Sequence, residues 1–282
     1  MKKIKTFALM STALIAMTFS PITNVAQAST DTDNIGTENI MSVAWFQTSS
    51  EARALYYQGY NTATNNMRNK LAQPSDRPYA VVLDIDETVL DNSPYQAYAL
   101  KNNVSYPTNW HNWILSAQAK ALPGVKNFLN LANANEVSIF YVSDRNKSTE
   151  TDATIKNLTE QGLPQADKDH VLLKSDGESG KSTRRSQVES QYNVIEYIGD
   201  NLTDFNDPET NSIDGRNDDV NTDSTYFGDK YIILPNPMYG GWESAIYNNN
   251  YAISDAEKSK LRQSYLNYYD PNTDSVTQIK AF

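Results

Sequence analysis

The sequence of 282 residues contains no cysteine, and this absence removes several kinds of chemistry at once. The chain can form no disulfide, hold no zinc ion through thiolates and use no cysteine as a nucleophile. Histidine is almost as rare, because only His111 and His170 occur. Neither lies in the R-H-G motif that a histidine phosphatase would need, so we interpret both as residues without a catalytic role.

Positive charge is scarce as well, since 24 Lys and Arg stand against 34 Asp and Glu, a formal net charge of −10. A protein that binds the backbone of a nucleic acid needs a basic surface, so we expect no polymeric nucleic acid as a partner. The acidic residues match no EF-hand spacing. Hydrophobic residues make up 39% of the chain, which is enough for a core, and the length allows one large domain.

The first 28 residues have the pattern of a secretory signal peptide. Three lysines precede an apolar run at 7–19 that is too short to span a bilayer, and an A-x-A site ends at Ala28. We expect cleavage after Ala28 and export, which removes three lysines and no acidic residue and takes the net charge from −10 to −13. No cysteine follows the apolar run, so we expect no lipid and no membrane anchor. Residues 29–41 are polar and are predicted to be flexible.

Short apolar runs alternate with helical patterns in the rest of the chain. This alternation predicts an α/β fold with a parallel sheet flanked by helices. The predicted strands cover 80–83, 137–142, 170–173, 194–198 and 231–234. The predicted helices cover 42–71, 148–161, 181–191 and 254–268, and another follows the turn at 122–125 and ends at Ala134. Residues 92–123 are predicted as a helical or irregular insert, and the acidic, asparagine-rich segment 203–229 as a long loop.

The stretch 79–95, Y-A-V-V-L-D-I-D-E-T-V-L-D-N-S-P-Y, is the most informative part of the chain. Its apolar strand ends in Asp84 and Asp86. Because alternate side chains of a strand share a face, both carboxylates can converge at the strand end, where open α/β sheets bind ligands. Two carboxylates there would repel each other unless a divalent cation or a shared proton relieved the repulsion.

Two further positions carry groups that suit a phosphate. Ser143 follows the second predicted strand, and its hydroxyl with the next backbone N–H groups could cradle phosphate oxygens; a turn or cap serine is the alternative. Lys181, in G-E-S-G-K-S-T-R-R, could offset negative charge as a compact ammonium group. The alternative for this lysine is a solvated basic patch, in which Lys174, Arg184 and Arg185 are competitors.

A second acidic pair, Asp200 and Asp204, lies in I-G-D-N-L-T-D-F after the fourth predicted strand. Asp200 can therefore meet Asp84 at the end of the sheet. Oxygen ligands, several waters and a phosphate oxygen describe an octahedral Mg²⁺ site. We expect Asp204 to hold a metal-bound water or to orient Lys181.

These strings together resemble a known family. D-I-D-E-T-V-L-D-N-S-P-Y is similar to the first motif of the class C acid phosphatases, also called the lipoprotein e 5′-nucleotidase family, in the haloacid-dehalogenase (HAD) superfamily. S-D-R at 143–145, the lysine at 181 and G-D-N-L-T-D-F resemble the second, third and fourth motifs. The resemblance covers about 43–267 and implies one HAD-like domain over 42–282, with a helical N-terminal segment and the insert. The lipoprotein members carry a lipid, which this chain lacks the cysteine to accept.

The resemblance implies a role for each motif. Asp84 is expected to be the nucleophile that forms an aspartyl-phosphate, and Asp86 the general acid and base. Asp84, Asp200 and the backbone carbonyl of Asp86 are expected to ligate Mg²⁺. Ser143 and Lys181 are expected to bind the phosphoryl group.

The resemblance also implies contacts with the substrate. Asp144 and Arg145 are expected to lie at the phosphate with Ser143. Three aromatic residues, Tyr106, Trp113 and Tyr239, are expected to stack on the leaving group, and the alternative is that they pack in the core or at its rim. Stacking tolerates any base, so nucleoside monophosphates and aryl phosphates are both expected substrates.

The sequence thus predicts a secreted, Mg²⁺-dependent acid phosphatase with an acidic optimum, because Asp86 must carry a proton in order to donate one. Two alternatives stay open. One is a phosphotransferase that passes the same intermediate to an alcohol, and the other is a ligand-binding protein or adhesin on a non-catalytic HAD scaffold. The oligomeric state also stays open, with a dimer as one alternative.

Overall fold

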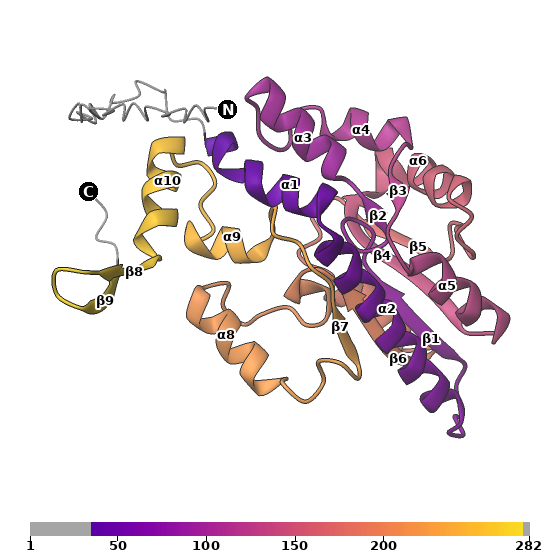
Figure 1. Ribbon diagram of the computed structural model, residues 1–282. Coiled ribbons are helices and arrows are strands. Elements are labelled where there is room, and N and C mark those ends of the chain that lie inside the picture. Colours follow the sequence, from indigo (N-terminus) through magenta and orange to yellow (C-terminus); the bar gives the residue numbers. More distant parts are fainter. Residues whose placement is uncertain (1–34, 279–282) are drawn as a thin grey trace, which may run out of the picture. The chain divides into compact units, whose positions relative to one another are not determined.

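The computed structural model describes residues 35–278, which Figure 1 shows in colour along the chain. The predicted signal peptide at 1–28 lies outside the described residues, as does the first part of the segment 29–41. From residue 35 the chain forms a 3-10 helix, η1 (Ile35–Asn39), and continues into α1 (Ile40–Thr48), so the described part of that segment is helical. Among the helices between residues 35 and 278, none combines the length and apolar character of a membrane span.

Five parallel strands form the central sheet, in the order β5-β4-β1-β6-β7. They are β1 (Tyr79–Leu83), β4 (Ser138–Asn146), β5 (Val171–Lys174), β6 (Asn193–Gly199) and β7 (Tyr231–Ile233). The predicted α/β fold is confirmed, and each predicted strand is present. β1 lies in the middle, and its apolar run is buried, as expected for a parallel strand with both faces covered.

Helices cover both faces of this sheet (Figure 1). Those that pack on it are α2 (Ser50–Leu71), α5 (Val125–Ala134), α6 (Lys147–Glu160) and α7 (Ser182–Glu189). Successive residues of a strand face opposite sides, so Val81 and Leu83 enter one core with α2, α5 and α6. Ala80 and Val82 enter a second core with Val188 of α7. The two cores hold β1 rigidly, and with it the acidic pair at its end.

The predicted helix at 42–71 is two helices, α1 and α2, separated by Ser49. Ser49 is extended, with φ −78° and ψ 138°. Its hydroxyl accepts a hydrogen bond from the backbone N–H of Ala52 at 2.9 Å, which satisfies a free donor at the start of α2. The helical pattern continues across this position, so only the serine cap marks the break.

The segment 203–229 is not a loop throughout, contrary to the prediction. It contains most of the 3-10 helix η2 (Leu202–Asp204) and all of α8 (Ile213–Thr222). Ser212 caps α8, since its hydroxyl accepts from the backbone N–H of Gly215 at 3.0 Å. The acidic composition of α8 hid a short helix that the cap and its contacts with the rest of the domain stabilise.

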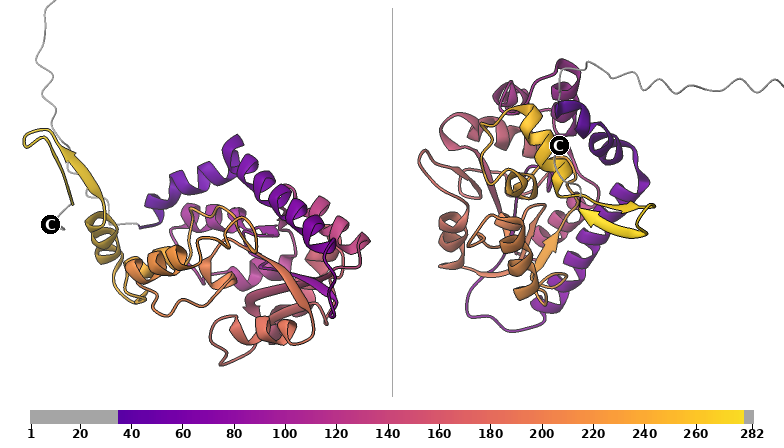
Figure 2. Two further views of the ribbon diagram at one scale, coloured as in Figure 1. Left: turned by 90° about the horizontal axis from the view of Figure 1, so that it is seen from below. Right: turned by 90° about the vertical axis from the view of Figure 1, so that its left-hand side faces the viewer.

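The predicted helix at 254–268 is too long at its C-terminal end. It is α10 (Asp255–Ser264), and an antiparallel hairpin of β8 (Asn267–Asp270) and β9 (Ser275–Gln278) follows, yellow in Figure 2. The adjacent tyrosines at 268 and 269 favour a strand, and Pro271 lies in the turn that closes the hairpin.

The insert after the first motif is mainly helical. It contains α3 (Ser93–Asn102) and α4 (Trp110–Ser116), and the short strands β2 (Leu90–Asp91) and β3 (Lys120–Ala121) pair antiparallel at its two ends. Helix α9 (Gly241–Ile246) follows the segment after β7 and precedes α10.

Candidate active site

The strand order brings the predicted motifs to one edge of the sheet. β4, β1 and β6 are neighbours. Asp84 and Asp200 directly follow the last residues of β1 and β6, and Ser143 lies in the second half of β4, three residues before its end. The backbone N–H of Asp84 donates to the carbonyl of Ile198 in β6 at 3.0 Å, which fixes two of these ends relative to each other. Lys181 lies directly before α7. This is the edge at which α/β proteins bind ligands.

Three carboxylates converge there, those of Asp84, Asp200 and Asp204. Each offers one oxygen, and the three oxygens lie within 4.8 Å of one another. Asp204, which was predicted to act from farther out, lies as close as the other two. A set of carboxylate oxygens is the kind of site that divalent cations such as Mg²⁺ and Ca²⁺ prefer.

Lys181 is buried between two of these carboxylates. Its Nζ donates to Oδ1 of Asp204 at 2.7 Å and also to Oδ1 of Asp84. Burial opposes the charge of Lys181, but Asp204 and Asp84 outweigh it and raise the pKa of the lysine above its ordinary value. Arg184 and Arg185 pair instead with carboxylates away from this cluster, so Lys181 is the basic residue of this segment that the structure places at Asp84.

Burial raises the pKa of two of these acids, Asp200 and Asp84. For Asp200 it raises the pKa to about 7, and the nearby charge of Asp204 adds to the effect. For Asp84 burial raises the pKa well above its ordinary value, although Lys181 opposes the shift. A positive charge among these oxygens would lower both pKa values.

The net charge of the site also fits a divalent cation. Four aspartates from the first and fourth motifs face two cationic side chains, Lys181 and Arg145. With all four aspartates ionised, the state that a bound cation would favour, two negative charges are left uncompensated, and one divalent cation would balance them. The donor atoms and the charge therefore agree.

Asp86 is held by three side chains. Arg145 Nη2 donates to its Oδ1 at 2.7 Å and Asn92 Nδ2 donates to the same oxygen at 2.8 Å, while the Ser143 hydroxyl donates to Oδ2 at 3.2 Å. Ser143 and Arg145 were predicted to bind phosphate, and in this structure their partner is Asp86. Both are buried, whereas the Asp86 side chain is 17% exposed, so Asp86 is the member of this group that solvent reaches.

The carboxylate of Asp144 does not join this group. It pairs with Arg184 at 2.8 Å and is half exposed. The same guanidinium donates to the carbonyl of Ser143, so Asp144 stabilises the end of β4 from outside. Of the three residues at 143–145, only the first and third turn their side chains to the acidic site.

The predicted aromatic residues lie in different settings. Trp113 Nε1 donates to Oδ1 of Asn92 at 2.7 Å, and the hydroxyl of Tyr239 donates to the carboxylate of Glu87. Both rings are partly buried and pack against the core around β1. Tyr106 is 68% exposed and packs edge-on against Trp110. The first two are therefore joined to the first motif, and Tyr106 lies at the rim.

Several residues of the site were not predicted from the sequence. Thr88 Oγ1 and Asn236 Nδ2 donate to the two oxygens of Asp200 at 3.0 and 2.9 Å. Asn92 holds Asp86, and Glu87 holds Tyr239. Thr88, Asn92 and Glu87 lie inside the stretch 79–95, and Asn236 lies three residues before Tyr239, but nothing in the spacing indicates their partners.

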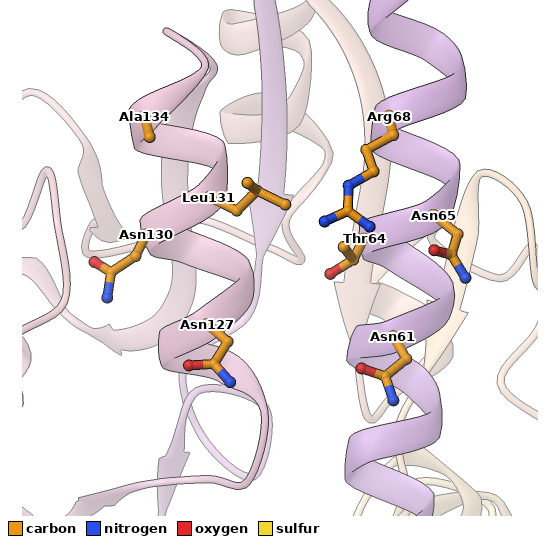
Figure 3. A pocket seen from close by; sticks show the side chains of 8 residues that line it. All are labelled: Asn61, Thr64, Asn65, Arg68, Asn127, Asn130, Leu131 and Ala134. Carbon is orange, nitrogen blue, oxygen red and sulfur yellow. The ribbon is translucent and has the colours of Figure 1, made fainter.

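A separate groove of about 770 Å³ lies between α2 and α5 (Figure 3). The side chains of Asn61 and Asn65 extend from α2 and those of Asn127 and Asn130 from α5, with Arg68 farther along α2. Its lining includes amides and one guanidinium but no carboxylate, and none of the residues at the acidic edge. The groove is therefore a surface hollow apart from the candidate active site.

The fold and the acidic edge define a class of protein, the HAD-like phosphohydrolases, with an aspartate pair after the first strand and a second pair after the strand beside it. Comparison with known proteins gives the family. The model of "HAD superfamily, subfamily IIIB (Acid phosphatase)" matches residues 5–242. The chain therefore belongs to the HAD subfamily IIIB acid phosphatases, which are phosphomonoester hydrolases, and the likeness seen in its motifs is confirmed.

Solved structures agree with this assignment. Two structures of the class C acid phosphatase from Bacillus anthracis, one with tungstate bound, share 45% sequence identity with this chain. Each matches with a TM-score of 0.82 over 84% of this chain and 100% of the other. Vegetative storage protein 1 from Arabidopsis thaliana is 29% identical over 145 residues, 48% of this chain; the match spans about half, 52%, of that protein.

Proposed function

We propose that this protein is a secreted, Mg²⁺-dependent acid phosphatase that hydrolyses phosphomonoesters through an aspartyl-phosphate on Asp84. The observation that carries the proposal is the convergence of Asp84, Asp200 and Asp204 around Lys181, beside Asp86, at one edge of the sheet. Asp84 and Asp200, with the backbone carbonyl of Asp86, would hold the cation, and Asp204 lies near enough to contribute. When bound, the cation reduces the repulsion between the attacking carboxylate and the phosphate dianion.

In the first step a carboxylate oxygen of Asp84 attacks phosphorus, and the bond from phosphorus to the leaving oxygen breaks. Asp86 gives its proton to that oxygen, so the product leaves as an alcohol. Lys181 offsets the charge on the phosphoryl oxygens. The incoming phosphoryl group competes for the donors of Ser143 and Arg145, which frees Asp86 from the contacts that hold it in this structure.

In the second step water attacks phosphorus and the bond to Asp84 breaks. Asp86, now deprotonated, takes the proton of the water, so inorganic phosphate leaves and both aspartates return to their starting states. An acidic optimum follows from the first step, since Asp86 must be protonated in order to donate.

Nucleoside monophosphates and aryl phosphates are the proposed substrates. The rings of Trp113 and Tyr239 are tied to the first motif, and Tyr106 lies at the rim, so flat leaving groups would find aromatic partners. The tungstate-bound structure of the Bacillus anthracis relative supports an oxyanion site, because tungstate is a tetrahedral oxyanion like phosphate. Tungstate should accordingly inhibit this protein in competition with substrate.

The test is an assay of the mature protein with p-nitrophenyl phosphate and a panel of nucleoside monophosphates. Activity should disappear with EDTA and return with Mg²⁺. Added glycerol would yield glycerol phosphate if the protein were mainly a phosphotransferase. The name of the plant relative, a storage protein, favours the alternative of a non-catalytic scaffold, and absence of turnover with all esters in Mg²⁺ would support that alternative.

Secretion is proposed on the N-terminal pattern alone. Cleavage after Ala28 leaves Ser29 as the first residue. N-terminal sequencing of the protein from the culture medium tests this directly, and a chain retained in the cells with Met1 in place would overturn it.

A further inference from the structure

Glu87, next to the predicted acid Asp86, has an unusual backbone. Its φ is +57°, in the left-handed region that residues other than glycine seldom adopt. Its N–H donates to the carbonyl of Leu90 at 2.9 Å, and its carbonyl accepts from the hydroxyl of Tyr56. Such a conformation persists only where the surroundings hold it, and it is concentrated at functional sites.

The carboxylate of Glu87 is completely buried and joins two parts of the chain. Oε1 accepts from the backbone N–H of Asn92 at 2.7 Å, and Oε2 accepts from the hydroxyl of Tyr239. These partners are 5 and 152 residues away in sequence. A buried carboxylate with a separate donor on each oxygen fixes both donors, because leaving either oxygen unpaired would be unfavourable.

Asn92 extends this network to the second aromatic ring. Its Nδ2 donates to Oδ1 of Asp86 at 2.8 Å, and its Oδ1 accepts from Nε1 of Trp113 at 2.7 Å. Tyr239 comes from the segment between β7 and α9, and Trp113 from α4 in the insert. One chain of hydrogen bonds thus runs from Tyr239 through Glu87 and Asn92 to Trp113, with a branch to Asp86.

We propose that Glu87 is a positioning residue that sets Tyr239 and Trp113 relative to Asp86 and so selects phosphomonoesters with flat leaving groups. This inference rests on the proposed function. The proton that Asp86 delivers must meet the leaving oxygen, and the rings must hold the group attached to that oxygen. Because Glu87 is linked to Asp86 and to both rings, it can keep the proton donor aligned with the leaving group that the rings hold.

The decisive measurement is a ratio of affinities for two phosphonates that cannot be hydrolysed, benzyl phosphonate and methyl phosphonate, in Mg²⁺. Tyr239→Phe keeps the ring and removes its bond to Glu87. Glu87→Gln keeps the size but places an amide N–H₂ where one oxygen accepted a donor. Both variants should lower the preference for benzyl over methyl phosphonate by about fivefold, part of the energy of one stacking contact.

The combined variant should lose less preference than the sum of the two single losses, because both changes remove the bond between Glu87 and Tyr239. Tyr247→Phe is the matched control. It removes another tyrosine hydroxyl that donates to a glutamate, Glu243 at 2.9 Å, outside the site, and should leave the preference unchanged. Thermal unfolding of each variant checks that it is folded.

Equal weakening of both phosphonates in Glu87→Gln would show a general structural role and overturn the proposal, as would an unchanged preference. Because phosphonates are not hydrolysed, the ratio is measurable even if the wild type turns over no ester, a result that would overturn the proposed function alone. Wild-type protein that binds neither phosphonate would overturn both.

Discussion

The acidic edge of the sheet and the groove between α2 and α5 both gather polar side chains from separate elements, yet they differ in pairing and burial. At the edge, Asp84 and Lys181 are 8% and 5% exposed and are bonded to each other. In the groove, the four asparagines are exposed, and their side chains make no hydrogen bond to other residues in the range 35–278. Buried charge is unfavourable unless it is paired. The paired, buried charges therefore distinguish the edge as a candidate site, whereas exposed polar side chains do not distinguish the groove.

Removal of the proposed nucleophile, Asp84, should give the largest contrast between the two regions. Asp84→Asn replaces an attacking carboxylate by an amide and should lower kcat by at least about 10⁴-fold, the scale on which loss of a covalent nucleophile acts. Asn65→Ala in the groove should leave kcat within about twofold. Steady-state rates with p-nitrophenyl phosphate in Mg²⁺ measure both. Similar rates for the two variants would contradict the assignment of the edge as the active site.

Removal of a basic side chain should lower the stability of the protein far more at the acidic edge than in the groove. In EDTA, Lys181→Met leaves Asp84 and Asp204 buried without their partner and should lower the free energy of unfolding by about 3–5 kcal/mol. Arg68→Met removes an exposed cation from the groove and should change it by no more than about 0.5 kcal/mol. Urea unfolding followed by circular dichroism provides the measurement. If Lys181→Met lowered the free energy of unfolding as little as Arg68→Met, the ion pairs of Lys181 would contribute nothing to stability, and the prediction would be wrong.

Glu196 on β6 is a buried acid that does not belong to the candidate active site. Neither of its carboxylate oxygens has a hydrogen-bond partner. Burial raises the pKa of Glu196 to about 9. The amide of Asn66 opposes this shift, but its N–H groups donate to the carbonyls of Gly228 and Asp229. This glutamate is therefore a buried acid that is neutral at pH 7.

A folded-state pKa above the unfolded value makes stability fall as pH rises. The contribution of Glu196 is complete below about pH 4.5, its unfolded pKa, and declines until pH passes about 9. Glu196→Gln should remove this dependence and raise the free energy of unfolding at pH 7 by about 3 kcal/mol. Urea unfolding from pH 5 to pH 8 tests it. Wild-type and variant curves that stay parallel over this range would refute the prediction.

Divalent cations should stabilise one region and leave the other unaffected. Mg²⁺ at 100 times its Kd should raise the free energy of unfolding by about 2.7 kcal/mol. Asp200→Asn should lose most of this gain, whereas Asn130→Ala in the groove should keep it. Thermal unfolding with Mg²⁺ and with EDTA reports the difference. An equal gain in both variants would place the cation elsewhere.

The outline of the fold was predictable because its signals are local. Each strand of the sheet is a short apolar run, and such a run needs only its own residues to be recognised. The breaks were not predictable in the same way. The local pattern favoured one long helix across Ser49, a loop in place of α8 and a longer helix in place of the hairpin after α10. In each case contacts in the folded chain outweigh that pattern.

The sequence by itself determined the candidate site residues, since Asp84, Asp86, Ser143, Lys181 and Asp200 lie in strings whose family likeness can be read without coordinates. The tertiary structure decided their partners. Arg145 meets Asp86 across 59 residues and Glu87 meets Tyr239 across 152. The physical reason is that a hydrogen bond is set by the distance between two atoms, and spacing along the chain leaves that distance open until the sheet and its helices pack.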